Sequence, residues 1–381
     1  MSVLKNLKTS EFVNIRRIIH QTPELAFHEF ETAKFIAEYL EELGIPKEEG
    51  IAGTGVVGFI EAPFATQTLL IRAEMDAVAV TEKTNLPHAS RRGGIMHSCG
   101  HDAHIAMLLG AARNLVAEQH NLKTNVKLVF QPAEESEEGA NAMVEAGVME
   151  GVTTAIALHV HPGARTNEII LKKGEMMAAN DKFEIALKGI GGQDANPVQN
   201  SSLTYVTSQI VNNLYSLIPR RFYAHDSALL SVCAVECGHA YNVMPSTATI
   251  RGSIRTYSDE VRELIPVYIE QIVGCMSAAY DIDSKVKFTR GNAPVINDDI
   301  MIDRAAKATI DVGHVIYQPR PSMGSDDFSA YSSRVPSCYV RIGCAPPGQR
   351  EPHSLHSEYF DIDENCIQVG IDFLTNFAMQ A

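Results

Sequence analysis

The sequence lacks any long apolar segment. It has no run of 18 apolar residues, and its first eight residues contain no apolar core of the kind found in a secretory signal. We therefore expect neither a membrane span nor a leader peptide. Low-complexity tracts are also absent, and the apolar share of 45% and the charged share of 20% are typical of a globular protein. A chain of 381 residues exceeds the size of one ordinary core, which favours two domains.

Positive charge is scarce as well. Lys and Arg number 32 against 46 Asp and Glu, a formal net charge of -14, whereas nucleic acids and anionic membranes require clustered Lys and Arg. This balance argues against both partners but not against a small anionic substrate, which a single Arg can hold. The seven cysteines are odd in number and scattered, which fits a reducing compartment better than a disulfide framework. Without a leader peptide, this composition predicts a cytoplasmic protein.

One short segment, His97-Ser-Cys-Gly-His-Asp-Ala-His104, concentrates reactive side chains. Cys thiolate and His imidazole are the donors that borderline divalent ions such as zinc prefer. The Ala- and Leu-rich stretch that follows has apolar residues at helical spacing, so a loop should enter a helix here, with Asp102 as its N-cap. One Cys and three His within eight residues favour a metal site over a solvated polar loop.

Polar side chains also follow several predicted strands. Strands at 68–73, 125–131 and 154–158 lead into acidic or imidazole groups, namely Glu74 and Asp76, Glu134 and Glu135, and His159. Predicted helices lie between most of these strands, so the pattern indicates an α/β protein with a mainly parallel sheet whose carboxyl edge carries metal ligands. Neighbours such as Glu134 and Glu135 would point to opposite faces of a regular strand, so a turn must bring both to one site. Solvated strand ends are the alternative for Glu74 and Asp76.

The pattern changes after about residue 180. Predicted elements follow in the order strand, helix, strand, strand, helix, strand, at 182–188, 203–217, 229–236, 247–256, 259–279 and 284–289. This βαββαβ order is the ferredoxin-like motif, and its strands alternate between apolar and polar residues. Buried-strand character resumes after residue 291. The simplest organisation is a first domain of residues 1–179 and 292–381, with an inserted domain at 180–291.

The most specific feature is a series of motifs in a fixed order. They are Met96-His-Ser-Cys-Gly-His-Asp-Ala-His, Gln131-Pro-Ala-Glu-Glu, Leu158-His, Asn242-Val-Met-Pro and Leu355-His-Ser. With His20-Gln-Thr-Pro-Glu-Leu and Arg72-Ala-Glu-Met-Asp-Ala, they resemble the M20 metallopeptidase superfamily. The similar subset is the N-acyl-amino-acid amidohydrolases, which include aminoacylases, hippurate hydrolases, N-acetyl-diaminopimelate deacetylases and auxin-conjugate hydrolases. The resemblance spans nearly the whole chain.

The resemblance implies a catalytic domain with two divalent metal ions (Zn, Mn, Co or Ni) and an inserted lid domain that also forms a homodimer. The metal ligands would be Cys99, His101, Glu135, His159 and His356. Glu134 would be the catalytic base, Asn242 and Arg255 would bind the substrate carboxylate, and Asp76 is a candidate supporting residue. The expected reaction is hydrolysis of an N-acylated amino acid, in which a carboxylate beside a ligand moves the proton of an activated water.

The chain departs from the family pattern at three positions. Where the family's lid carries Gly-Gly-His-Ala-x-x-Pro, this chain reads Gly191-Gly-Gln-Asp-Ala-Asn-Pro197. Gln193 can donate a hydrogen bond to the substrate but cannot become cationic, and the loss of one oxyanion donor typically costs ~10²–10³ in rate. Glu74 and Asp326 replace the usual Asp and Glu. A dipeptidase on the same scaffold and a catalytically weak binding or regulatory homologue therefore stay open as alternatives.

Overall fold

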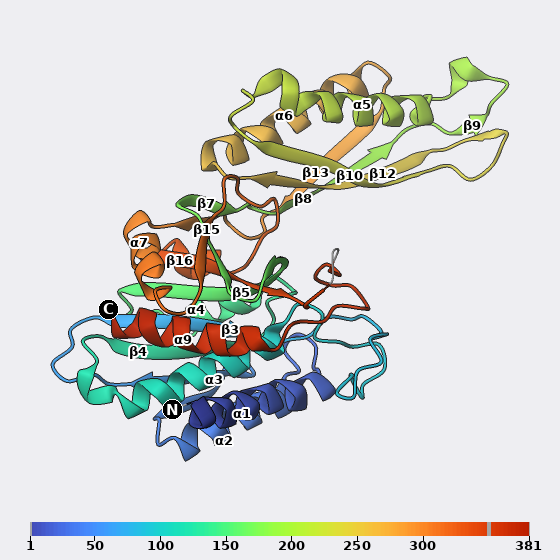
Figure 1. Cartoon of the computed structure of the whole chain (residues 1–381). Helices are drawn as coiled ribbons and strands as arrows, with labels where there is room; N and C mark the ends of the chain where they lie inside the picture. The colour runs from blue at the N-terminus through green and yellow to red at the C-terminus, as the bar shows by residue number, and fades with distance from the viewer. Residues whose placement is uncertain (1, 349–351, 381) are drawn as a thin grey trace. The chain divides into compact units, whose positions relative to one another are not determined.

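Two separate hydrophobic cores organise the chain. The computed structural model describes residues 2–348 and 352–380, and they divide into two compact units (Figure 1). Unit 1 comprises the chain up to Met176, Val295–Arg320 and the part from Asp326 onward, and unit 2 comprises Met177–Pro294 and Pro321–Ser325. One core lies wholly within unit 1 and the other wholly within unit 2. Each unit therefore buries its own apolar side chains.

Unit 1 is built on an eight-stranded sheet. The strands are β1 (Lys47–Ile51), β2 (Gly55–Ile60), β3 (Thr68–Glu74), β4 (Asn125–Gln131), β5 (Thr154–Arg165), β6 (Glu168–Leu171), β15 (His314–Tyr317) and β16 (Ser337–Ala345). Their order is β1-β2-β4-β3-β5-β16-β6-β15. The pairs β3–β4, β3–β5, β5–β16 and β6–β15 are parallel, and the others are antiparallel. The predicted α/β fold with a mainly parallel sheet is confirmed.

Helices cover this sheet. They are α1 (Ser2–Gln21), α2 (Phe30–Glu42), α3 (His101–Ala117), α4 (Gly139–Glu145), α7 (Asp299–Ala308), α8 (Ser329–Ser332) and α9 (Asn365–Met379), with a short 3-10 turn at Gln119–Asn121. A small sheet pairs β7 (Gly174–Met177) with β14 (Val295–Asn297). Helix α3 packs against α1, α9, β3 and β5, and most of its residues are buried (Figure 1). Its first turn therefore lies inside unit 1 rather than on the surface.

Unit 2 has the predicted order of elements. They are β8 (Asp181–Lys188), α5 (Leu203–Arg221), β10 (Ala228–Cys237), β12 (Thr247–Thr256), α6 (Asp259–Ala278) and β13 (Asp283–Thr289). The strands form an antiparallel sheet in the order β10-β12-β8-β13, which is the ferredoxin-like arrangement. A second small sheet pairs β9 (Gly192–Gln193) with β11 (Val243–Met244), and Pro197–Gln199 form a 3-10 turn. In the described part of the chain, no helix has both the length and the apolar character needed to cross a membrane.

Candidate metal centre

The Cys99–His101 loop enters α3 through a glycine. Gly100 has a φ of +84°, in the left-handed region that glycine tolerates best. A Cβ on Gly100 would lie 2.4 Å from Cγ2 of Val160, so the missing side chain also lets the loop pack against β5. Cys99 and His101 are both buried. The glycine thus allows two donor side chains to flank a tight entry into the helix.

Asp102 anchors this loop rather than capping the helix. The residue at the N-cap position of α3 is Gly100, so the prediction that Asp102 is the N-cap is wrong. The Asp102 carboxylate instead accepts hydrogen bonds from Nε of Arg16 and Nδ1 of His20, each at 2.7 Å. Both of these residues lie on helix α1. All three side chains are buried. Burial alone would raise the pKa of Asp102. The charge of Arg16 and the hydrogen bond from His20 outweigh burial and hold this pKa well below its ordinary value.

His101 presents one ring nitrogen to the site. Its Nδ1 donates to the main-chain oxygen of Asp76 at 2.9 Å, and the Asp76 carboxylate accepts the Glu135 main-chain N–H at 2.9 Å. In the neutral ring a proton on Nδ1 leaves the lone pair on Nε2, and this buried atom has no hydrogen-bond partner among the described residues. Asp76 therefore orients His101 and ties it to the segment that carries Glu135.

A turn brings Glu134 and Glu135 to the same place, as the sequence requires. Strand β4 ends at Gln131, Ala133 has a φ of +56°, and residues 134–137 form a turn closed by the Glu137 N–H on the Glu134 carbonyl at 2.8 Å. Oε2 of Glu134 lies 3.9 Å from Nε2 of His101. Oε1 of Glu135 lies 3.0 Å from Nε2 of His356. Both carboxylates thus face imidazoles from other parts of the chain.

His159 and His356 approach from distant segments. The Nε2 atom of His159 lies 3.5 Å from the Cys99 sulfur, and its Nδ1 donates to the Val160 carbonyl at 2.8 Å. Strand β5 continues to Arg165, so His159 lies within the strand rather than at its end as predicted. The main-chain N–H of His356 donates to Ser98 O at 2.8 Å, which joins the C-terminal segment to the metal loop. The structure thus brings together all five side chains predicted as ligands.

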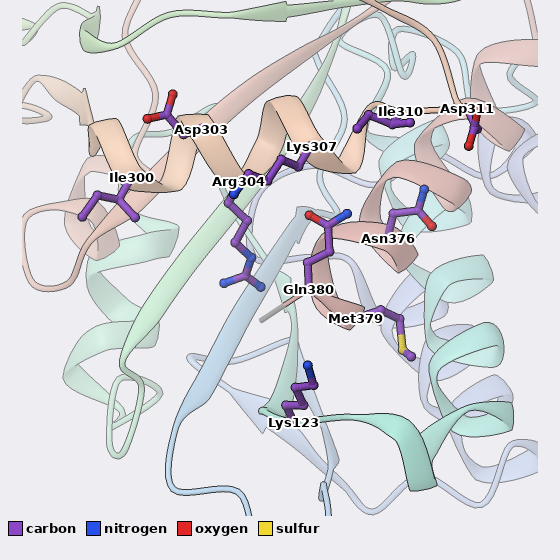
Figure 2. A pocket seen from close by; sticks show the side chains of 10 residues that line it. All are labelled: Lys123, Ile300, Asp303, Arg304, Lys307, Ile310, Asp311, Asn376, Met379 and Gln380. Atoms are coloured by element: carbon purple, nitrogen blue, oxygen red, sulfur yellow. The ribbon is translucent and has the colours of Figure 1, made fainter.

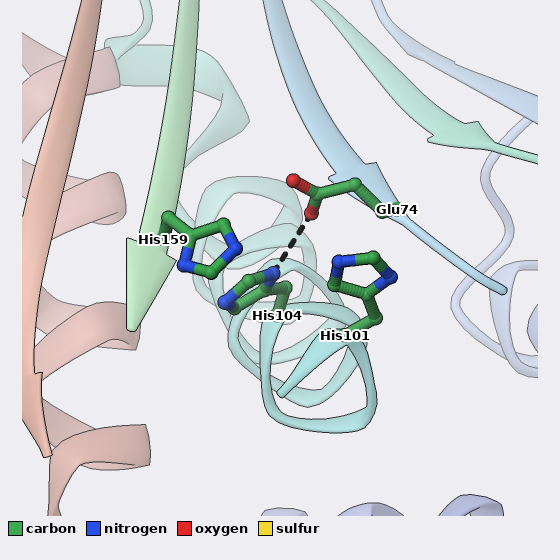
Figure 3. Close-up of side chains that lie close together, drawn as sticks. All are labelled: Glu74, His101, His104 and His159. Atoms are coloured by element: carbon green, nitrogen blue, oxygen red, sulfur yellow. Dashed lines mark hydrogen bonds and ion pairs between the residues drawn. The ribbon is translucent and has the colours of Figure 1, made fainter. Parts of the chain in front are cut away.

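Among the residues that the structure describes, potential donor atoms gather in three groups. Cys99, His101 and Glu135 form one, and Glu134, Asp326 and Asp327 form another. The third is Glu74, His101, His104 and His159 (Figure 3). In the second group, Arg72 Nη2 binds Asp326 and Asp327 at 2.7 and 2.6 Å, so a guanidinium already neutralises those acids.

His104 is not available to a metal ion, although its ring lies among these side chains. The Val160 main-chain N–H donates to Nε2 of His104 at 2.9 Å, so Nε2 must be the acceptor. Nδ1 then carries the proton and donates to Oε2 of Glu74 at 2.8 Å, as the dashed line in Figure 3 marks. Both ring nitrogens of His104 are occupied. This leaves the group of Cys99, His101 and Glu135, with His159 and His356 beside it, as the candidate metal centre.

Arg72 connects both charge-conserving departures from the family pattern. Its guanidinium is fully buried and binds Glu74 through Nη1, Asp326 through Nη2 and the side-chain oxygen of Gln131 through Nε at 2.9 Å. The longer Glu74 and the shorter Asp326 thus share one partner. Burial alone would raise the pKa of Glu74, but the charge of Arg72 holds this pKa well below its ordinary value. Sequence reasoning assigned no role to Arg72, although Arg72 and Glu74 stand two apart on a strand and so share a face.

The centre concentrates negative charge. Burial and the carboxylates of Asp326, Asp327 and Glu135 raise the pKa of Glu134 well above its ordinary value. Burial and the charges of Glu135 and Glu134 raise the pKa of the Cys99 thiol in the same way. A bound cation relieves both effects, because it offsets the mutual repulsion of these groups.

The three side chains predicted to bind substrate belong to unit 2. Gln193 pairs with Val243 between β9 and β11, and the Asp194 N–H donates to Asn242 O at 3.4 Å. Gln193 is exposed, and its Oε1 accepts from Asn196 Nδ2 at 3.4 Å, which leaves its amide N–H groups free to donate. Arg255 on β12 is partly buried, and its Nη1 donates to Met323 O at 2.8 Å. Gln193 therefore lies on this small sheet, and Asn242 directly precedes its strand β11.

A wide depression on unit 1 is separate from this centre. It has a volume of about 1020 Å³ and lies between α7 and the end of α9, with Lys123 on its opposite wall (Figure 2). Arg304 reaches into it, but Nε and Nη2 of Arg304 bond the Phe377 carbonyl at 3.1 and 2.7 Å. This arginine therefore caps the last turn of α9. None of the predicted ligands lines the depression.

The residues present fit divalent metal ions. One thiol, three imidazoles and a carboxylate converge, and the inward-facing Nε2 atom of His101 is buried without a partner in the described structure. Zn, Mn, Co and Ni all accept such mixed sulfur, nitrogen and oxygen donors. The α/β fold and this donor set define a metal-dependent hydrolase. A family profile for peptidase family M20/M25/M40 matches residues 70–380, so the chain belongs to that family, as its motifs predict.

Characterised relatives align along most of the chain. It is 36% identical to the N-acetyl-L-cysteine deacetylase of Bacillus subtilis (strain 168), over 97% of this chain and 88% of that protein. It is also 36% identical to the hippurate hydrolase of Campylobacter jejuni, over 87% of each. Among solved structures, the Bacillus subtilis YXEP protein, a dinuclear metal binding peptidase from the M20 family, matches with a TM-score of 0.87 and 31% identity over 98% of both chains. These similarities support amidohydrolase activity.

Proposed function

We propose that this protein hydrolyses the amide bond of a small N-acyl-L-amino acid or a close conjugate. The observation that carries the proposal is the convergence of Cys99, His101, Glu135, His159 and His356 around the turn that bears Glu134. The names of the relatives support the substrate class, since a deacetylase of N-acetyl-L-cysteine and a hippurate hydrolase are both among them. The net charge of -14 is compatible with a small anionic substrate that is bound locally.

The five converging side chains would hold two divalent ions. Such ions polarise a bound carbonyl and lower the pKa of a coordinated water. Asp76 fixes the tautomer of His101, and the Val160 carbonyl does the same for His159, so each imidazole presents Nε2 to the centre. The chain's own contribution is to keep these donors oriented while leaving Glu134 accessible.

Glu134 would act as the general base and then the general acid. Its side chain is 13% exposed, so water and substrate can reach a carboxylate that is otherwise enclosed. An Oε atom of Glu134 would take the proton of the attacking water and deliver it to the leaving nitrogen. Arg255 and Asn242 would bind the substrate carboxylate. In the described part of the chain, Arg255 uses only Nη1 in a hydrogen bond, to Met323 O, which leaves Nε and Nη2 for a bidentate contact. Gln193 would donate a hydrogen bond to the scissile carbonyl.

Amine release from a panel of N-acyl-amino acids tests this proposal. The protein would be assayed with Zn, Mn, Co or Ni in turn, and we expect release that depends on added metal. The best substrate would then identify the acyl group and the amino acid. If the protein binds metal but releases amine from no member of the panel, the proposed reaction is wrong.

Gln193 favours a second candidate, a weak enzyme that acts mainly as a binding or regulatory protein. A neutral amide stabilises a developing oxyanion less than an imidazolium does. If the glutamine weakens catalysis, Gln193→His should raise kcat by up to ~10²–10³. Steady-state kinetics on the best substrate measure this, with Asn196→His at the same loop as the control. A fall in kcat would indicate instead that Gln193 is adapted to its own substrate.

Self-association through unit 2 is a further part of the proposal. Strand β10 pairs only with β12, so its other edge is free to pair with a second copy in the described structure. Leu229 and Val235 on this strand are 43% and 48% exposed.

We expect a mass of twice 41.7 kDa by light scattering for the parent, and 41.7 kDa for the double variant Leu229→Lys/Val235→Lys. Ile310→Lys, at an exposed position of unit 1, should leave the mass unchanged. A dimeric double variant would rule out the β10 edge.

A cytoplasmic location stays part of the proposal. None of the seven cysteines forms a disulfide bond in the described structure, and four of them are buried. This pattern supports a reducing compartment.

A further inference from the structure

We propose that His104 is a positioning residue that fixes the imidazole of His159 through the backbone of Val160. The inference rests on the proposed role of His159 as a metal ligand. His104 itself cannot bind a metal, because Nε2 accepts the Val160 N–H and Nδ1 donates to Glu74. Its role must therefore be exerted through its neighbours.

The main chain of Val160 is held on both sides by histidines. Its N–H donates to His104 at 2.9 Å, and its carbonyl accepts from Nδ1 of His159 at 2.8 Å. The N–H and the carbonyl lie in successive peptide groups joined at the Val160 Cα, so restraining the first group also limits the second. The carbonyl sets the tautomer of His159, so its position decides whether Nε2 of His159 faces Cys99. The Val160 side chain packs against Gly100, where no Cβ intervenes. The backbone of Val160 is thus held by the hydrogen bond at its N–H and by the packing of its side chain.

The two rings are also in direct contact. The ring centroids of His104 and His159 are 4.6 Å apart, with their planes inclined at 64°, and Figure 3 shows His104 lying beneath His159 between α3 and β5. Loss of the His104 ring would leave space into which His159 could turn. One residue therefore restrains the tautomer and the rotation of the proposed ligand.

Glu74, on the other side of His104 from Val160, is held by buried ion pairs. Glu74 accepts from His104 and from Arg72, and Arg72 is bound in turn to Asp326 and Asp327. All of these groups are buried. Since Arg72 keeps Glu74 ionised, Glu74 can only accept, and the proton on His104 must lie on Nδ1. The ion-pair cluster thereby keeps Nε2 of His104, the nitrogen that faces Val160, unprotonated and able to accept.

Metal affinity tests the inference without reference to turnover. Co²⁺ would be titrated into the metal-free protein, and the cobalt–thiolate absorption of Cys99 would report binding. We expect His104→Ala to weaken Co²⁺ binding by about 10- to 100-fold. His104→Gln can still accept the Val160 N–H, whereas His104→Asn can reach only toward Glu74. Gln should therefore retain more affinity than Asn. Glu74→Gln should also weaken binding, since it disturbs the tautomer without removing the ring.

Controls separate this inference from the proposed function and from a purely structural role. His161→Ala, two residues along β5, should change affinity by less than about twofold, and circular dichroism at the titration temperature would verify that each variant is folded. His159→Ala should abolish tight binding; parent-like binding by this variant would contradict the ligand set itself. If His159→Ala loses Co²⁺ while all folded variants of His104 and Glu74 bind like the parent, the positioning role of His104 is refuted. Equal losses in His104→Gln and His104→Asn would rule out the path through Val160.

Discussion

Glu134→Gln should abolish most amide hydrolysis while leaving the metal content unchanged. The amide keeps the size of the carboxylate but cannot accept the proton of the attacking water, and such acid–base steps contribute ~10²–10⁴ to rate. The turn at residues 134–137 separates this role from that of the neighbouring Glu135, whose carboxylate faces His356. We therefore expect kcat/KM for amine release to fall by ~10²–10⁴.

The control for this prediction lies in the same turn region. Glu138→Gln makes the same chemical change at an exposed position and should leave kcat/KM within about twofold. Elemental analysis should find parent-like metal in both variants, whereas Glu135→Gln should lose metal. A Glu134→Gln variant with full metal and more than a tenth of the parent activity would mean that another group moves the proton.

Asp181→Asn should destabilise unit 2 by about 3–5 kcal/mol, the cost of breaking a buried ion pair. Asp181 begins β8 and accepts from Nε and Nη2 of Arg262 at 2.7 Å each, and from the Gly291 N–H at 3.0 Å. Both side chains are buried, so the variant leaves the Arg262 guanidinium inside the unit without its carboxylate partner. Native-state hydrogen exchange can follow β8 and β13 separately from unit 1, whereas the chain has no tryptophan to report on either unit.

This effect should depend on pH. Burial alone would raise the pKa of Asp181, but the hydrogen bonds from Arg262 and Gly291 outweigh it, and the net pKa is lowered. A carboxylate with a lowered pKa stabilises the fold above its unfolded value of about 4, and this contribution is lost as pH falls through the folded value. The gap between parent and variant should therefore shrink below about pH 4.

Arg290 provides the matched control. Its Nη1 contacts Asp181 at 3.1 Å, but its side chain is 45% exposed. Arg290→Gln should cost no more than about 1 kcal/mol, as is usual for exposed ion pairs. Equal losses in Asp181→Asn and Arg290→Gln would contradict the claim that the buried Arg262 pair stabilises unit 2.

Most of the secondary structure could be predicted from periodicity. The predicted strand at 247–256 and the strand β12 coincide, and the predicted helix at 259–279 differs from α6 by one residue. These segments bury one face or both, and burial leaves a regular pattern in the sequence. The clustering of Cys99 and His101 was equally accessible, because the two donors are close in sequence.

Contacts between residues far apart in the sequence could not be predicted from periodicity. Asp102 looks like an N-cap by residue type, yet its carboxylate binds Arg16, 86 positions away. In the sequence, Asp326 and Glu74 are two separate departures from a family pattern. Only the fold shows that both bind Arg72, which lies 254 positions from Asp326. His101 and His104 stand one helical turn apart and look equivalent. Their different roles depend on which main-chain groups their nitrogens meet, and residue type carries no information about that.

The position of β16 has a consequence for how the protein is made. Strand β16 lies between β5 and β6 in the sheet, yet about 170 residues separate the end of β5 at Arg165 from the start of β16 at Ser337. Translation at ~5–20 residues per second would take roughly 10–30 seconds to cover this gap. During that time the ribosome-bound chain has an open edge on β5, beside His159, and still lacks His356. The newborn protein therefore passes through a stage in which the strand carrying one proposed ligand is exposed, and neither the sheet nor the metal centre is complete until unit 2 has left the ribosome.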